Sequence, residues 1–468
     1  MRPVILPVLV AGLLLLIPEI VIGMPKAVAA WAAVINVVWL TALGFRRSRL
    51  AGENPWLSPS FIHMLYLFVL QYGIGMLFVL YGEFFVDYMT WDPREVFELQ
   101  ESIPRASWLI MIGALGTYVG LCVPVLPIAR SLPRLAWVED EGKFPFRALL
   151  IVPLTVAAYL YSYSDQAPGE IQQTVYIVGT FGLVLMVCGF VRLLRGTTHV
   201  IAWRLVAGTV VVVYCGVGLF LGARSVLMFV VIYYLWSLIG VRGKPSRKLL
   251  VGFLASFLVF SFGVFPLLSV YKYHRMGGLV PVEEAIQRTM EDLNAGDEPK
   301  LAGLIELVRS TTYPATYVAS YQRIAPDPYP YLLGESARVV VSGLVPRILD
   351  PDKPNVLQYV QGLAYRAGLF TYQTYFEADQ RGGIAIDYVS EFYLNFGPWG
   401  VLILSLLHGM YLQTRYDWLI RRSSLELGFP VYAVAFLTAS AFWQMFVLDV
   451  KNWAIWISLL WLCSRRGR

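Results

Sequence analysis

The feature that most constrains this chain is a succession of long apolar stretches separated by short polar segments. A bilayer core about 30 Å thick needs about 20 apolar residues per helix, and twelve stretches of roughly that length occur in the 468 residues. They cover approximately residues 3–23, 27–44, 60–81, 106–128, 148–163, 171–193, 205–222, 225–240, 249–270, 396–414, 427–447 and 450–463. With 57% hydrophobic and only 15% charged residues, the chain lacks the polar surface of a soluble globule. The sequence therefore predicts an all-α, polytopic membrane protein with about twelve transmembrane helices.

The Lys and Arg residues predict the orientation of these helices, because positive charges accumulate in cytoplasmic loops. With a cytoplasmic N-terminus, 21 of the 37 basic residues lie inside, 5 lie in short outer loops and 11 lie in one long outer loop. Residues 1–270 then hold nine transmembrane helices, 271–390 form a large periplasmic loop, and 391–468 hold three more helices, with both termini cytoplasmic. We expect the first stretch to be retained rather than cleaved as a signal peptide, because Pro18-Glu19 interrupts it and cleavage would invert every later loop.

The predicted outer loop is too long to be a passive connection and should contain its own structure. Pro281 followed by VEEAIQRTMEDLNAG predicts a helix that ends near Gly296. Further helices are expected over 300–309 and 332–341. The segment LVPRILDPDKPN at 344–355 contains three prolines, which excludes a regular helix and predicts a rigid, kinked loop within an outer loop that is otherwise mainly helical.

Several functional classes find no support in the sequence. The net charge of +6 is accounted for by the orientation signal, and we expect no nucleic-acid partner. All four cysteines fall within apolar stretches, which indicates core packing rather than disulfides or thiolate metal sites. Neither a glycine-rich phosphate loop nor a paired-histidine metal motif is present in the sequence, so no metal site is predicted.

Three short motifs resemble those of Wzy-type O-antigen polymerases. They are GARS at 222–225, LVPRILDPDKP at 344–354 and DYVSEFYLNFGPWG at 387–400, and the layout of many spans with a large outer loop in the second half is similar too. O-antigen ligases have a related plan, so polymerase and ligase both remain open.

The resemblance implies a membrane-embedded, GT-C-like glycosyltransferase at the periplasmic face of the bacterial inner membrane. It implies undecaprenyl-diphosphate-linked glycans as donor and acceptor, and no cofactor. It also makes the lipid bilayer a partner, and a chain-length regulator and a flippase candidate partners.

Such a reaction releases a diphosphate and needs fixed cations near the membrane surface. Arg224 follows a tight predicted turn at headgroup depth, where it binds phosphate or simply extends toward the interface. Arg347 and Lys353 lie in the proline-rich loop and either bind the diphosphate or pair with neighbouring acids. Arg275 belongs to a cationic cluster after the ninth span, which is a second phosphate candidate or a solvated helix end.

The acceptor hydroxyl needs a base, and Glu391 and Asp387 are the main candidates. They are four residues apart and share one face if the segment is helical. Acids at the mouth of an apolar helix are costly unless they face a cavity or a partner. His274 at the predicted outer surface is an alternative base, and His408 within the tenth span is interpreted as a buried, hydrogen-bonded residue.

Two other classes compete with a glycosyltransferase. A twelve-span transporter would carry acids near the midplane and matching halves, and the span interiors here are almost free of acids. A non-catalytic subunit of an envelope complex would use the large loop for docking, and the sequence leaves that alternative open.

Overall fold

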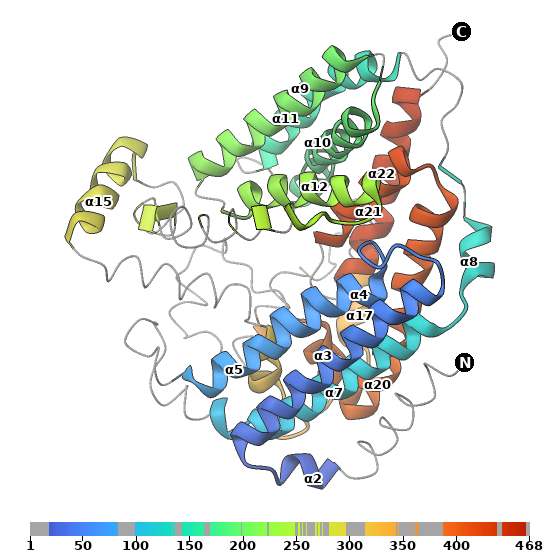
Figure 1. Ribbon diagram of the computed structural model, residues 1–468. Helices are drawn as coiled ribbons and strands as arrows, with labels where there is room; N and C mark the ends of the chain where they lie inside the picture. Colours follow the sequence, from blue (N-terminus) through green and yellow to red (C-terminus); the bar gives the residue numbers. More distant parts are fainter. Residues whose placement is uncertain are drawn as a thin grey trace. The chain divides into compact units, whose positions relative to one another are not determined.

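The computed structural model describes most of the predicted helices. The described residues are 18–82, 99–132, 134–135, 143–162, 169–197, 199–221, 224–248, 280–295, 314–342, 387–437 and 442–464, with isolated positions between 251 and 274 and between 345 and 363. Within this part of the chain the secondary structure is helical and contains no β-strand (Figure 1). Five helices are long and apolar enough to cross a membrane, and they confirm a polytopic membrane protein. These five are Lys26–Leu50, Pro59–Leu80, Ile103–Cys122, Phe144–Ser162 and Thr174–Arg195.

Contacts divide the chain into two compact units. The first contains residues 1–129, 308–416 and 439–448, and the second contains 130–307, 417–438 and 449–468. This division groups helices by packing, whereas the three consecutive segments predicted from the sequence describe topology.

The first unit is built around three helices that run in the same direction. They are α3 (Lys26–Leu50), α7 (Ile103–Cys122) and α20 (Tyr388–Tyr416), and Figure 1 shows them side by side. The other elements are α2 (Pro18–Ile22), the continuous helix α4 (Pro59–His63), η1 (Met64–Gly73) and α5 (Ile74–Leu80), and α17 (Glu335–Ser342). The short helix α8 (Leu126–Ser131) follows α7.

Glycines allow α7 and α20 to pack backbone against backbone. A Cβ added at Gly120 would lie 2.0 Å from the carbonyl oxygen of Leu406, and one at Gly116 would lie 2.7 Å from that of Leu402. In α20, a Cβ at Gly409 would lie 2.1 Å from the carbonyl oxygen of Thr117. Small residues of this kind are typical of helix interfaces in membranes. The matched order along both helices shows that they are parallel, which the predicted topology requires of its fourth and tenth spans.

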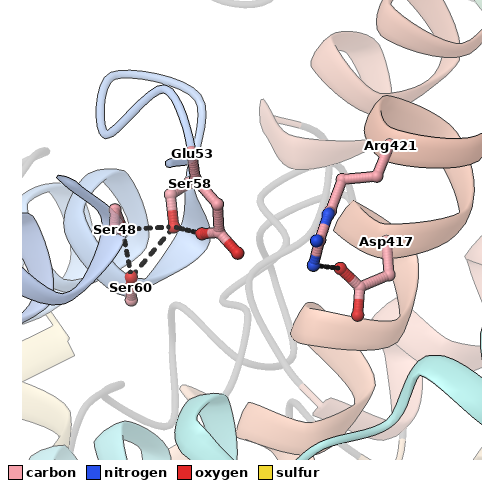
Figure 2. A network of polar contacts seen from close by, with 6 residues as sticks. All are labelled: Ser48, Glu53, Ser58, Ser60, Asp417 and Arg421. Atoms are coloured by element: carbon pink, nitrogen blue, oxygen red, sulfur yellow. Dashed lines mark hydrogen bonds and ion pairs between the residues drawn. The ribbon is translucent and has the colours of Figure 1, made fainter. Parts of the chain in front are cut away.

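A cluster of hydroxyl groups closes the turn between α3 and α4 (Figure 2). Ser48, Ser58 and Ser60 bond to one another over 2.8–2.9 Å, and Ser58 also donates to Glu53. These bonds satisfy buried polar groups near the end of a membrane helix, where unpaired ones are costly. Gly44 allows α3 to lie close to the backbone of α4, since a Cβ at this position would lie 1.6 Å from the Ser60 carbonyl oxygen.

The second unit contains α9 (Phe144–Ser162), α10 (Gly169–Arg195), α11 (Val200–Leu221), α12 (Arg224–Arg242), α15 (Val282–Ala295), η5 (Asp417–Arg422), α21 (Leu425–Leu437) and the part of α22 (Phe442–Ser464) from residue 449 onward. Tyr159 of α9 stacks on Tyr214 of α11 with ring centroids 4.2 Å apart. The Trp456 indole of α22 donates to the Ile177 carbonyl of α10 over 3.0 Å. Asp417 and Arg421 form an ion pair of 3.1 Å within η5 (Figure 2).

The structure corrects the predicted boundary near the C-terminus. The sequence predicted one span over 427–447 and another over 450–463, divided at the charged residues Asp449 and Lys451. Instead α21 ends at Leu437, and α22 runs without a break from Phe442 to Ser464. The reason is that 442–464 contains neither Gly nor Pro, so two charges alone do not stop the helix.

The predicted helices of the large loop are partly within the described residues. The helix after Pro281 is confirmed as α15, and the helix predicted over 332–341 is present as α17, beginning later at Glu335. It begins later because Leu333 and Gly334 have positive φ values of 48° and 93°. The helix predicted over 300–309 and the proline-rich loop at 344–355 lie outside the described residues, apart from the exposed Val345.

Candidate functional site

The start of α20 carries the two predicted carboxylates on consecutive helical turns. The Glu391 amide donates to the Asp387 carbonyl over 2.9 Å, which confirms that the segment is helical from its first turn. The Asp387 side chain caps this turn, because its Oδ1 accepts a hydrogen bond of 3.0 Å from the Ser390 amide. The same oxygen accepts a bond of 2.6 Å from the Tyr72 hydroxyl of η1, and the Ser390 hydroxyl bonds to Oδ2.

Both acids are buried more deeply than expected for residues at the mouth of a helix. The exposed fraction is 3% for Asp387 and 2% for Glu391. Burial raises the pKa of the Asp387 carboxyl to about 6, although the hydrogen bonds from Ser390 and Tyr72 lower it. Asp387 therefore titrates close to the physiological range.

A kink in α20 places the large loop beside these acids. Phe396 and Gly397 leave the helical conformation, with φ of −141° and 65°, and Pro398 has no amide hydrogen to bond back to the Leu394 carbonyl. The amides of Leu332 and Leu333 occupy the carbonyls of Leu394 and Asn395 instead, over 2.8 and 3.0 Å. The backbone acceptors freed by the kink thus bind the segment before α17.

Asn395 completes this junction with its buried carboxamide. Its Oδ1 accepts a bond of 2.9 Å from the Gly334 amide, and its Nδ2 donates over 2.7 Å both to the Ser336 hydroxyl and to the Glu391 carbonyl. The side chain that holds the loop therefore also holds the backbone of the proposed base.

A chain of buried polar rings continues from the acids along α20. Tyr388 lies edge-on to His408 with ring centroids 4.6 Å apart, and His63 at the end of α4 lies 5.3 Å from His408. All three residues are at most 5% exposed. His408 is buried as predicted, but the sequence did not indicate the second histidine, because it comes from a distant helix.

A cavity of about 370 Å³ opens in the first unit beside the starts of α3 and α7. Its lining residues are Ile22, Glu101, Ser102, Pro104, Arg105, Gln322 and Arg323. Arg105 donates to the Tyr393 hydroxyl over 2.6 Å, and Tyr393 donates to the Ala325 carbonyl over 2.7 Å. In the sequence, Arg105 is one of the five basic residues of the short outer loops and indicates only the orientation of the helices. Its position beside Pro104 at the start of an apolar helix was the available hint.

The structure does not bring the remaining predicted site residues together with Asp387 and Glu391 within the described residues. His274 bonds to Asp292 of α15 over 2.7 Å in the second unit, whereas Asp387 and Glu391 belong to the first. Arg224 is the first residue of α12, and its side chain lies outside the described residues. Arg275, Arg347 and Lys353 also lie outside them.

Comparison with known proteins identifies the family. No curated protein and no solved structure matched this chain with significant similarity. The family model for the O-antigen polysaccharide polymerase Wzy matches residues 147–463, a region that includes α20 and the whole of the predicted outer loop. Because the match covers more than half of the chain, the chain belongs to the O-antigen polysaccharide polymerase Wzy family, and together with its apolar helices this membership indicates a multi-pass protein of the bacterial inner membrane.

Proposed function

We propose that this protein joins undecaprenyl-diphosphate-linked oligosaccharide repeat units into a surface polysaccharide at the periplasmic face of the inner membrane. The observation that carries the proposal is the family match over 147–463, which indicates a glycosyltransferase-type polymerase. A GT-C-like architecture with about twelve spans and cytoplasmic termini belongs to the same proposal. A flippase that delivers the repeat unit and a chain-length regulator are its proposed partners.

The reaction exchanges one bond at the anomeric carbon of the growing glycan. The bond from this carbon to the lipid diphosphate breaks, and the diphosphate leaves with the electron pair. A hydroxyl oxygen of a second lipid-linked repeat unit forms the new glycosidic bond and gives its proton to a carboxylate. Fixed cations stabilise the charge on the departing diphosphate, and the carboxylate accelerates attack by general base catalysis.

We assign the base to Glu391, with Asp387 and then His274 as substitutes. The supporting observation is that Glu391 lies within a rigid turn, held by the Asp387 cap before it and by Asn395 after it. Asp387 already accepts hydrogen bonds from Tyr72 and Ser390, which suits a capping residue better than a proton acceptor. Arg224, Arg275, Arg347 and Lys353 are the cations that the sequence proposes for the diphosphate.

The glycan profile of a strain that lacks this protein tests the proposal against the ligase alternative. A lost polymerase leaves single repeat units on the final acceptor, because transfer continues without chain growth. Restoration of long chains by the wild-type gene is the control. Accumulation of long lipid-linked polymer in the deletion strain would instead indicate a ligase and contradict the proposal.

A further inference from the structure

The cavity beside the starts of α3 and α7 has an excess of positive charge. Two arginines, Arg105 and Arg323, and one acid, Glu101, line the cavity. Glu101 also forms an ion pair with Lys26 at the start of α3. Ile22 and Pro104 supply apolar surface next to these charges. An anion attached to an apolar chain matches this combination of neighbouring surfaces.

Two parts of the chain that the sequence places on the same side of the membrane meet at this cavity. Lys26 and Arg105 belong to predicted outer turns, and Gln322 with Arg323 belong to the predicted outer loop. The cavity is therefore at the level of a helix end, where the polar part of a lipid lies. A headgroup there would be reached directly from the bilayer.

Arg105 is held in place by a residue of α20. The Tyr393 hydroxyl accepts a hydrogen bond from the Arg105 guanidinium and donates one to the Ala325 carbonyl. The guanidinium carbon also lies 5.6 Å from the centre of the Tyr393 ring, a distance typical of cation–π contact. Since a guanidinium has five N–H groups and Tyr393 is a neutral partner, Arg105 retains both its charge and donors for a ligand.

We propose that this cavity binds the diphosphate headgroup of a polyprenyl-linked glycan, with Arg105 and Arg323 as binding residues and Tyr393 as the residue that positions Arg105. Arg105 is suited to this role because its planar group can engage phosphate oxygens bidentately. The inference rests on the proposed function. It adds a binding site on the first unit that neither the predicted cations nor the family match assigns.

Purified full-length protein in nanodiscs of neutral phosphatidylcholine allows binding and polymerisation to be measured separately. The binding probes are undecaprenyl diphosphate, inorganic pyrophosphate and phosphatidylglycerol, and the substrate for polymer formation is the lipid-linked repeat unit. We expect undecaprenyl diphosphate to bind Arg105→Gln about 10- to 100-fold more weakly than wild type, the effect of a lost charge-assisted contact. Arg105→Lys should lose less affinity for undecaprenyl diphosphate, because lysine keeps the positive charge.

Two further variants separate a binding role from a structural one. Tyr393→Phe keeps the ring but loses the hydroxyl, so it should raise KM for the lipid-linked repeat unit by several-fold with a smaller change in kcat. Arg288→Gln is the matched control, because Arg288 is an exposed residue of α15 already paired with Glu284. It should leave binding and polymer formation unchanged.

The failures of the two proposals are distinguishable. If wild type forms polymer and Arg105→Gln binds undecaprenyl diphosphate normally, the cavity assignment is wrong and the polymerase proposal stands. If undecaprenyl diphosphate binding depends on Arg105 but wild type forms no polymer from lipid-linked repeat units, the cavity assignment stands and the polymerase proposal fails. Equal, Arg105-dependent binding of phosphatidylglycerol would show a general lipid-phosphate site and overturn the diphosphate assignment. The assignment would also be overturned if the protein bound inorganic pyrophosphate but did not bind undecaprenyl diphosphate.

Discussion

Asp387 directly precedes α20, Glu391 lies in its first turn, and hydrogen bonding gives the two acids different surroundings. The Asp387 carboxylate accepts bonds from an amide, a tyrosine hydroxyl and a serine hydroxyl. These bonds fix the first turn of α20 and therefore the position of Glu391. We therefore propose that Asp387 is a cap that positions Glu391, and that the two acids make separate contributions to activity.

Replacement of Glu391 by Gln should abolish chain growth while the protein remains folded and inserted. Gln preserves size and hydrogen bonding but cannot accept the proton, and a general base contributes about 10²–10⁴-fold in rate. Polymer formation by purified protein from lipid-linked repeat units measures this loss. Glu335→Gln is the matched control, because Glu335 is exposed in the first turn of α17.

The same assay on Asp387→Asn completes the comparison. Asn is also a favourable capping residue, so this variant should keep substantial activity. Normal chain growth in Glu391→Gln with loss in Asp387→Asn would move the base to Asp387. Full activity in both would exclude either acid and favour His274 or the substrate itself.

The raised pKa of Asp387 predicts a pH dependence of stability. Because burial raises the pKa from 3.8 to about 6, the folded protein retains a proton that the unfolded chain releases. The free energy of unfolding should therefore fall as pH rises from about 4 to about 6. About two pKa units correspond to about 3 kcal/mol.

Comparison with Asp387→Asn isolates this contribution from that of other carboxyls. The temperature at which half of the detergent-purified protein has unfolded should fall more steeply with pH for wild type than for Asp387→Asn between pH 4 and 6. Parallel curves for the two proteins would contradict a buried, ionisable Asp387 in the folded state.

Two structural features hold the elements of the first unit together. One is the row of glycines that brings the backbones of α7 and α20 together. The other is the kink of α20 at Gly397 and Pro398, which frees carbonyl oxygens that then bind the loop before α17. The glycines set the distance between α7 and α20, and the kink connects the large loop to the segment that carries the carboxylates.

Substitution of Gly120 by Ala should destabilise the first unit. The added Cβ would meet the backbone of Leu406 and Met410 at 2.0–2.9 Å, so the two helices must separate, and overpacking of this kind typically costs about 1–3 kcal/mol. Gly208→Ala in α11 is the matched control, since nothing lies within 4 Å of its added Cβ. Heat stability in detergent should fall for the first variant only. An equal stability of both variants would contradict the close packing.

Substitution of Asn395 by Ala should release the segment before α17 from α20. The change removes three hydrogen bonds and leaves the Gly334 amide without its acceptor, and each buried unsatisfied group costs about 1–3 kcal/mol. We expect faster trypsin cleavage after Arg338, detected by mass spectrometry of the fragments. Asn294→Ala, at an exposed position of α15, should leave the cleavage rate unchanged. Unchanged cleavage in Asn395→Ala would show that the backbone bonds alone hold the loop.

At the scale of the whole molecule, the predicted topology agrees with the directions of the helices within each unit. The parallel course of α3, α7 and α20 suits three helices that cross the membrane in the same direction. In the second unit, Gly179 approaches Tyr159 while Gly182 approaches Thr155, so α9 and α10 are antiparallel, as consecutive spans must be. The absolute orientation is a prediction from the basic residues.

Labelling of single cysteines tests that orientation. In a background without the four native cysteines, Asp297→Cys in the predicted periplasmic loop should react with a membrane-impermeant thiol reagent in cells with a permeabilised outer membrane. Lys244→Cys, exposed after α12, should react only after the inner membrane is opened. Reaction of Lys244→Cys but not Asp297→Cys in intact cells would invert the map.

The sequence alone determined the membrane environment, the all-helical class, the positions of most helices and the pairing of Asp387 with Glu391 on one helical face. These properties depend on hydropathy and on a period of 3.6 residues, both of which are local. It also provided the resemblance to the Wzy family that the comparison then confirmed. The break between α21 and α22 was misplaced because charges near 449–451 resemble a loop but do not interrupt a helix.

Only the tertiary structure decided which distant groups meet. The contact between Arg105 and Tyr393 joins residues 288 positions apart, and that between Tyr72 and Asp387 joins residues 315 apart. The contact of His63 with His408 and the binding of the loop at the kink of α20 also join residues that are far apart in the sequence. Such contacts depend on which faces of the helices pack together and on how closely glycines allow them to approach, and neither property is encoded by any single stretch of sequence.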